Sequence, residues 1–156
     1  MRKNITKKGF TLIEVLIVIG IIGILATIVL VAINPARQFA EARNTQRVSN
    51  VNTILNAIGQ RIAENKGLFA VNGCTIDIPT ATSTIKSGTP ADIASCIVPT
   101  YVSLLPFDPS AAAAHYNSNS DYDTQYDVRK DGATGRISVC VVTANEELGQ
   151  PICVTR

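Results

Sequence analysis

The segment "KKGFTLIEVLIVIGIIGILATIVL", residues 7–30, decides the fold of this chain. The chain is almost wholly apolar from Phe10 to Ile33, and residues 15–33 include no charged side chain. A helix needs about 20 apolar residues to cross the hydrocarbon core of a bilayer. Basic residues precede the run and few follow it immediately, a pattern that places the N-terminus in the cytoplasm. The sequence therefore predicts one membrane-spanning helix that starts near the N-terminus.

A cleaved secretory signal peptide is the first alternative for this segment. The apolar region of such a peptide spans about 7–15 residues and ends at a small-residue cleavage site. Here the run is longer, and it continues as "VAINPARQFAEAR", residues 31–43, in a pattern that remains helical. These features disfavour an ordinary cleaved signal peptide.

Length and charge limit the remaining possibilities. At 156 residues the chain is long enough for one domain and a tail. The net charge is +2, and four of the basic residues lie within the first eight positions. Without residues 1–9, ten basic and twelve acidic side chains would remain, a net charge of −2. The rest of the chain therefore has no basic excess that favours a nucleic acid, and no specific nucleic acid is expected as a partner.

A short motif at the start of the apolar run carries a family resemblance. The segment Lys8-Gly9-Phe10-Thr11-Leu12-Ile13-Glu14 resembles the prepilin signature of type IV pilins and type II secretion pseudopilins. The resemblance implies a leader at residues 1–9, which a prepilin peptidase removes by cutting after Gly9. The same enzyme then methylates the new amine of Phe10. It further implies an α+β, type IV pilin-like fold, in which a long kinked N-terminal helix spans the membrane with its first half and packs on a small antiparallel sheet with its second.

The resemblance also implies a structural rather than a catalytic function. The chain would be a subunit of a type IV pilus or a pilus-like filament, inserted among inner-membrane lipids until an assembly platform polymerises it with copies of itself and other pilins. After assembly, the subunit would be located in an extracellular pilus or in a periplasmic pseudopilus. The alternatives are a type II secretion pseudopilin and a DNA-uptake minor pilin, although the second predicts a basic head. A signal-anchored enzyme or binding domain is a further alternative of a different class.

Glu14 is the one carboxylate inside the apolar run, where an ionised group costs about 3 kcal/mol or more. The resemblance gives it a role in assembly, because the carboxylate at this position in the family faces the N-terminal amine of a neighbouring subunit. Opposite charges attract strongly in a low-dielectric core, although desolvation offsets much of the gain. We therefore expect Glu14 to be satisfied only when subunits dock. A carboxylate that snorkels to the headgroup level is the alternative.

The apolar segment leads into a second helical pattern. Residues 10–35 are expected to form the transmembrane and polymerisation helix, and residues 36–156 the globular head. Pro35 interrupts the helix, because proline removes a backbone hydrogen bond and clashes with the previous turn; a kink or the start of a second helix follows. We expect one long kinked helix over residues 10–64, amphipathic over 36–64. Its apolar stripe recurs at helical spacing and faces a sheet: Val48, Val51, Ile54, Leu55, Ile58 and Ile62.

The rest of the head is predicted as a loop region followed by strands. Residues 65–124 lack a sustained period and form a connecting region. Within it, the proline-bounded "VPTYVSLLPFDPS", residues 98–110, is expected to carry five side chains into the core: Tyr101, Val102, Leu104, Leu105 and Phe107. Residues 125–156 alternate or run apolar in "TQYDVRK", "GRISVCVV" and "PICVTR". They predict a three-stranded antiparallel meander whose apolar face covers the helix stripe.

All four cysteines follow the membrane segment, which suits an oxidising compartment. Three pairings are possible. Alternation places Cys140 and Cys153 on the face opposite their apolar neighbours, where two paired strands bring them together. We favour Cys140–Cys153 and Cys74–Cys96, the second closing the connecting loop. Many pilins close a C-terminal loop by a disulfide, and free thiols are the alternative.

The sequence suggests no metal, cofactor or catalytic site. The chain has no C-x-x-C pair and a single histidine, His115, which disfavours zinc. Asp121, Asp123 and Asp127 alternate as calcium ligands do, but the glycine and the final glutamate of a calcium loop are missing, so a polar turn is expected. Neither G-x-S-x-G nor a glycine-rich phosphate loop is present. We therefore expect a protein that is not an enzyme.

Overall fold

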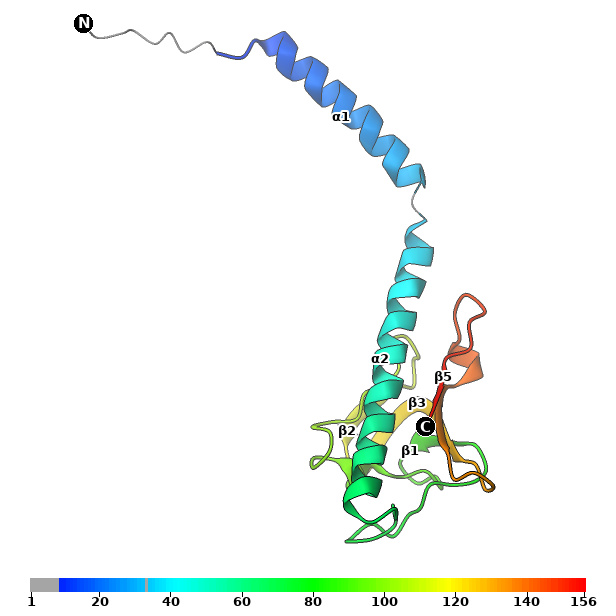
Figure 1. Ribbon diagram of the computed structural model, residues 1–156. Coiled ribbons are helices and arrows are strands. Elements are labelled where there is room, and N and C mark those ends of the chain that lie inside the picture. Colours follow the sequence, from blue (N-terminus) through cyan, green and yellow to red (C-terminus); the bar gives the residue numbers. More distant parts are fainter. Residues whose placement is uncertain (1–8, 33) are drawn as a thin grey trace, which may run out of the picture. The chain divides into compact units, whose positions relative to one another are not determined.

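The computed structural model describes residues 9–32 and 34–156 (Figure 1). The predicted leader therefore lies outside the described residues, except for Gly9, and so does Ile33. The chain divides into two units, Met1–Gln38 and Phe39–Arg156. Its elements are, in order, α1 (Leu12–Ala32), α2 (Pro35–Glu64), β1 (Ser83–Lys86), α3 (Ala94–Ile97), β2 (His115–Ser118), β3 (Asp121–Lys130), β4 (Ile137–Val141), the 3₁₀ helix η1 (Thr143–Asn145) and β5 (Cys153–Thr155). An apolar helix followed by a second helix and a small antiparallel sheet confirms the predicted α+β, pilin-like arrangement.

The chain forms two helices where one long kinked helix was predicted. Asn34 caps the second, since its side-chain oxygen accepts a bond from the Arg37 amide at 3.3 Å and its carbonyl accepts one from Gln38 at 3.2 Å. Pro35 is the first residue of α2, a position where its missing N–H leaves no bond unmade. The residue before a proline is disfavoured in a helix. The break predicted at Pro35 is thus the start of a second helix.

The sheet is built around β3. This strand pairs antiparallel with β1, β2 and β4, and β4 pairs with β5, so the main order is β1-β3-β4-β5. The strands β3, β4 and β5 form the predicted C-terminal meander, and β3 begins at Asp121, a few residues earlier than expected. β1 and β2 come from the region predicted as a connecting loop. Each has only four residues and no apolar alternation, which is why the sequence pattern missed them.

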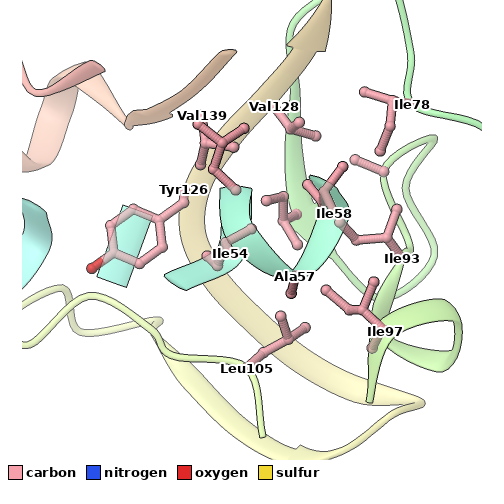
Figure 2. Close-up of a cluster of buried hydrophobic side chains, with 14 of the residues drawn as sticks. Ile54, Ala57, Ile58, Ile78, Ile93, Ile97, Leu105, Tyr126, Val128 and Val139 are labelled. Carbon is pink, nitrogen blue, oxygen red and sulfur yellow. The ribbon is translucent and has the colours of Figure 1, made fainter. Parts of the chain in front are cut away.

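The core lies between α2 and the sheet, and side chains from the connecting region close it. Figure 2 shows its centre, with labelled side chains that include Ile54, Ala57, Ile58, Ile97, Leu105, Tyr126, Val128 and Val139. The predicted stripe of α2 is correct for Val51, Ile54, Leu55 and Ile58, which are buried, and Ile62 packs at the edge. Val48 is 44% exposed, so its placement in the core was wrong. The buried face continues along α2 through polar side chains instead: Asn44, Arg47, Asn50 and Arg61.

The proline-bounded segment 98–110 contributes less to the core than predicted. Leu105 is fully buried, and Tyr101 and Val102 pack partly against the cluster. Leu104 and Phe107 are 52% and 39% exposed, so the prediction that they enter the core was wrong. The segment is neither helix nor strand at these residues. Neighbouring side chains of such a segment point to different sides, and only one of the two adjacent leucines reaches the interior.

Candidate assembly site

The residues of the predicted processing site lie just before α1. Gly9 and Phe10 are outside any helix, and the side chain of Phe10 is 88% exposed. A Cβ added at Gly9 would have no heavy atom within 4 Å outside its own neighbours. Gly9 and Phe10 are therefore not covered by the residues that the structure describes. Cleavage and methylation at this bond remain predictions.

The first turn of α1 contains a reciprocal cap. The Glu14 carboxylate accepts hydrogen bonds from the Thr11 amide at 2.7 Å and from the Thr11 hydroxyl at 2.8 Å. The Glu14 amide in turn donates to the Thr11 hydroxyl oxygen at 3.3 Å. This is a capping box, in which two helix-end amides that lack helical partners are satisfied by side chains. The expectation that Glu14 is satisfied only by docking was therefore wrong, because its own chain already supplies two donors.

The rest of α1 presents an apolar surface on all sides. Every side chain from Leu12 to Val29 is exposed. These 18 residues form the one helix in the described ranges, 9–32 and 34–156, that is long and apolar enough to cross a membrane. The Thr27 hydroxyl donates to the Gly23 carbonyl at 2.9 Å, so it does not leave an unmade bond on this surface. Burying the whole surface requires lipid or other protein.

The face of α2 that points away from the sheet carries no exposed charge between Ala42 and Ala63. The arginines in this stretch point toward the head, where they are buried or half-buried: Arg43, Arg47 and Arg61. Polar side chains on the outer face bond back to their own helix. Thr45, Asn52 and Thr53 each donate to the carbonyl four residues earlier, at 2.8–2.9 Å. The hydroxyl protons of the two threonines and one amide proton of Asn52 therefore already have acceptors within the helix.

An ion network fixes the loop between β4 and β5 to α2. Glu147, in this loop, accepts bonds from Nε and Nη2 of Arg43 at 2.6–3.0 Å and from Nη1 of Arg47 at 2.7 Å. The side-chain amide of Asn44 donates to the Glu147 carbonyl at 3.1 Å. The bonds from Arg43, together with those from Arg47, hold the pKa of Glu147 below its ordinary value. The loop is thus fastened to α2 at Glu147 by both side chain and backbone.

Arg47 extends the network into the interior. Its guanidinium and the carboxylate of Asp108 are both fully buried, with Nε and Oδ2 2.7 Å apart. Burial alone would raise the pKa of Asp108, but bonds from Arg47 and from the amides of Ser110 and Ala111 lower it below its ordinary value. Sequence analysis did not identify Arg47, Asp108 or Glu147. The only signals were a charged position on the buried face of an amphipathic helix and an acidic residue among prolines, and neither specifies a partner.

The four cysteines form two disulfides, Cys74–Cys96 and Cys140–Cys153, the two pairings favoured from the sequence. Cys140 and Cys153 are direct cross-strand partners in β4 and β5, with Cα atoms 4.2 Å apart. This disulfide closes the loop that carries Glu147. Cys74 and Cys96 are both buried and join the segment after α2 to α3.

The carboxylates considered for calcium have separate partners. Asp121 accepts bonds from His115 and Asn117, Asp123 pairs with Lys86 at 3.0 Å, and Asp127 accepts one from Thr84. Within the described ranges, no three acidic, histidine or cysteine residues cluster closely enough to hold a metal ion. The Ala113 carbonyl and the Asp121 carboxylate hold the pKa of His115 above its ordinary value. Asp121 thus links β3 to β2, whereas Asp123 and Asp127 link β3 to β1.

Comparison with known proteins bears on the N-terminal segment. Neither a curated protein nor a solved structure matches the chain. Residues 5–30 match the family model described as the prokaryotic N-terminal methylation motif. This match includes Gly9, Phe10 and Glu14 and ends inside α1. The chain therefore carries the signature of type IV pilins and pseudopilins, on a helix that is apolar enough to anchor it in a membrane.

Proposed function

We propose that this protein is a structural subunit of a type IV pilus or a pilus-like filament. The observation that carries the proposal is the methylation motif at residues 5–30, which continues directly into an apolar helix that no residue described by the structure buries. In the membrane, lipid covers α1. In a filament, the same surface is buried against α1 helices of other copies, and this exchange lets one segment serve both as an anchor and as a polymerisation element.

The outer face of α2 supports packing between copies. It lacks exposed charges from Ala42 to Ala63, and several of its polar groups already bond to the helix backbone. An apolar helix of another copy can therefore cover this face without burying an unpaired charge. The charged residues of α2 in this stretch are held on the opposite side by the head, as the bonds of Arg47 and Arg61 illustrate. We assign this face to the interior of the filament.

Processing and topology follow from the same motif. A prepilin peptidase removes residues 1–9 and methylates Phe10, and the N-terminus faces the cytoplasm while the head lies beyond the inner membrane. An assembly platform in that membrane adds the subunit to the filament. In the filament, Glu14 faces the amine of a neighbouring Phe10. Its bonds to Thr11 satisfy it while the subunit waits in the membrane.

The test is to shear filaments from cells that make the protein and to identify their subunit by intact-mass analysis. We expect filaments whose subunit begins at an N-methylated Phe10. Replacing Gly9 by Asp blocks cleavage, and the uncut chain accumulates in the membrane. Filaments built of a chain that retains residues 1–9, or a chain that never polymerises, would falsify the proposal. A processed chain that forms only short periplasmic polymers, and whose deletion stops protein secretion, assigns it to the pseudopilins instead.

A further inference from the structure

Leu148 occupies an unusual position in the loop that Glu147 anchors. Its side chain is 45% exposed, and its backbone has a φ of +60°, which bulky residues rarely adopt. The preceding residue is held by Arg43, Arg47 and Asn44, and the Cys140–Cys153 disulfide closes the ends of the loop. The loop therefore presents an apolar side chain at a fixed place on the head, at the expense of local backbone strain.

A groove on the same head can receive such a side chain. It has a volume of about 250 Å³ and lies between the C-terminal half of α2 and the start of β4, lined by Leu55, Ile58, Gly59, Ile62, Gly135, Ile137 and Arg156. For comparison, an apolar cavity of about 150 Å³ accommodates benzene. A Cβ added at Gly59 would meet no heavy atom within 4 Å, so the absence of a side chain here helps to keep the groove open.

Leu148 cannot reach the groove of its own chain. Asn44 contacts Glu147, whereas the groove is centred near Gly59, fifteen residues further along the same helix. At about 1.5 Å per residue, these points are roughly 22 Å apart along the axis of α2. A contact between the leucine and the groove must therefore join two copies. Because the leucine and the groove are different surfaces, copies can meet head to tail, an arrangement that can repeat along a filament.

The charges around the two surfaces are complementary. The loop 142–151 contains Glu146 and Glu147 and no basic residue. Arg43 and Arg47 already pair with Glu147, whereas Glu146 forms no ion pair with any residue that the structure describes. Arg156 lines the groove. Glu146 beside the leucine and Arg156 at the groove therefore favour the same docking.

We propose that Leu148 of one copy inserts into the groove at Gly59 of a second copy, as a contact between neighbouring heads in the filament. This inference rests on the proposed function, since a contact of this size is too small to hold two isolated heads together. The contact between Leu148 and the groove forms once the apolar helices have placed the subunits side by side. The Arg43–Glu147–Arg47 network and the disulfide are then positioning elements that hold the leucine for its partner.

Photocrosslinking in the full-length chain tests the contact directly. With p-benzoylphenylalanine at position 148, ultraviolet light should give a covalent dimer in assembled polymer. Trypsin cuts after Arg47, Arg61 and Arg136, so the expected product joins peptide 137–156 to peptide 48–61, which contains most of the helical side of the groove. The same probe at Leu104, which is also half-exposed, should not label peptide 48–61. Crosslinks from position 148 that go only to other surfaces overturn the inference.

Matched substitutions give a second, independent test. Leu148→Asn introduces a residue that tolerates a positive φ, and it removes the apolar contact. Gly59→Leu fills the groove. Each should lower the ratio of polymer to membrane-inserted chain at least fivefold while the thermal midpoint of the head does not fall. Leu104→Asn and Gly59→Ala should change that ratio less than twofold. Normal polymer yield for both test variants overturns the contact alone, whereas a wild-type chain that never polymerises overturns the proposed function with it.

Discussion

Arg47 and Asp108 form a fully buried ion pair that joins α2 to the proline-bounded segment 98–110. The guanidinium contacts both carboxylate oxygens, with distances of 2.7 Å from Nε to Oδ2 and 3.2 Å from Nη2 to Oδ1. The same guanidinium also bonds Glu147. One buried side chain thus connects the helix, the segment before β2 and the loop between β4 and β5. Removing one partner of a buried pair leaves the other charge uncompensated in the interior. Such a substitution therefore lowers the free energy of unfolding.

Asp108→Asn should destabilise the head by about 3 kcal/mol, a value typical of breaking a buried ion pair. Urea unfolding of the detergent-solubilised chain, followed by tyrosine fluorescence, measures this change. The control is Asp77→Asn, which weakens an exposed pair with Lys130 at 3.7 Å and should cost less than about 1 kcal/mol. Equal effects of the two substitutions would show that the buried pair adds nothing beyond a surface contact.

Stability should fall at acid pH because the pKa values of Glu147 and Asp108 are lowered in the folded head. A lowered folded-state pKa contributes stability that is complete above the unfolded value and is lost as the pH falls through the folded value. The contribution of these two carboxylates to the thermal midpoint should therefore be constant from pH 7 to about 5 and decline below about pH 4, where unfolded carboxyl groups begin to protonate. Glu147→Gln should flatten part of this decline. An unchanged acid profile in this variant would exclude Glu147 as a source.

The two disulfides should open in a fixed order under a mild reductant. Cys153 is exposed, whereas Cys74 and Cys96 are each about 5% exposed or less. Attack on a disulfide requires access to a sulfur atom, so alkylation should label Cys140 and Cys153 first. Opening this bond, which spans 13 residues, should lower the free energy of unfolding by about 3 kcal/mol. Peptide mapping at increasing reductant concentration gives the order, and simultaneous labelling of all four thiols would contradict it.

Two glycines should respond oppositely to the same substitution. Gly59 lies in the interior of α2 and Gly135 has a φ of +71°, and a Cβ at either position would meet no heavy atom within 4 Å. Gly59→Ala should stabilise the head by up to about 1 kcal/mol through helix propensity. Gly135→Ala should destabilise it, because alanine is strained at a positive φ. Chemical denaturation compares the two, and a destabilised Gly59→Ala would mean that the helix does not have its described geometry at this residue.

Local patterns were sufficient to predict the elements that are long or strongly periodic. The apolar run gave α1, the spacing of Val51, Ile54 and Ile58 gave the buried face of α2, and the alternation in 135–142 gave β4. Pairing across long sequence separation was not predictable. Arg47 and Asp108 are 61 residues apart, and a buried arginine follows the same helical period as the isoleucines. The strands β1 and β2 form because β3 offers them backbone groups that β4 does not pair, a tertiary cause that four-residue segments do not reveal.

The cap at the start of α1 was not predicted from the sequence, for a different reason. Thr11-Leu12-Ile13-Glu14 fits the spacing of a capping box, whereas the resemblance to prepilins predicts an intermolecular role for Glu14. Both roles use the same carboxylate. The hydrogen bonds to Thr11 satisfy it within one chain, and an amine of a second chain can add a further donor, because a carboxylate has about four acceptor sites.

Glu14→Gln and Glu14→Ala separate these two roles. Glutamine at this position still accepts a bond from the Thr11 amide, so the helix start is kept while the charge is lost. Alanine removes both the cap and the charge, and Thr11→Ala removes the hydroxyl that completes the cap while leaving the charge. If the charge aligns incoming subunits, both Glu14 variants should reduce filament yield and raise the pool of membrane-inserted chain, whereas Thr11→Ala should assemble nearly normally.

The ranking of these variants decides between the mechanisms. Cell fractionation followed by quantification of filament and membrane pools gives the yield, and the amount of inserted chain controls for expression. If the cap were the important element, Thr11→Ala would resemble Glu14→Ala, and Glu14→Gln would resemble the wild type. If all three variants assembled normally, Glu14 would act only in the single chain, and the attraction between its carboxylate and a neighbouring amine would have no part in subunit docking.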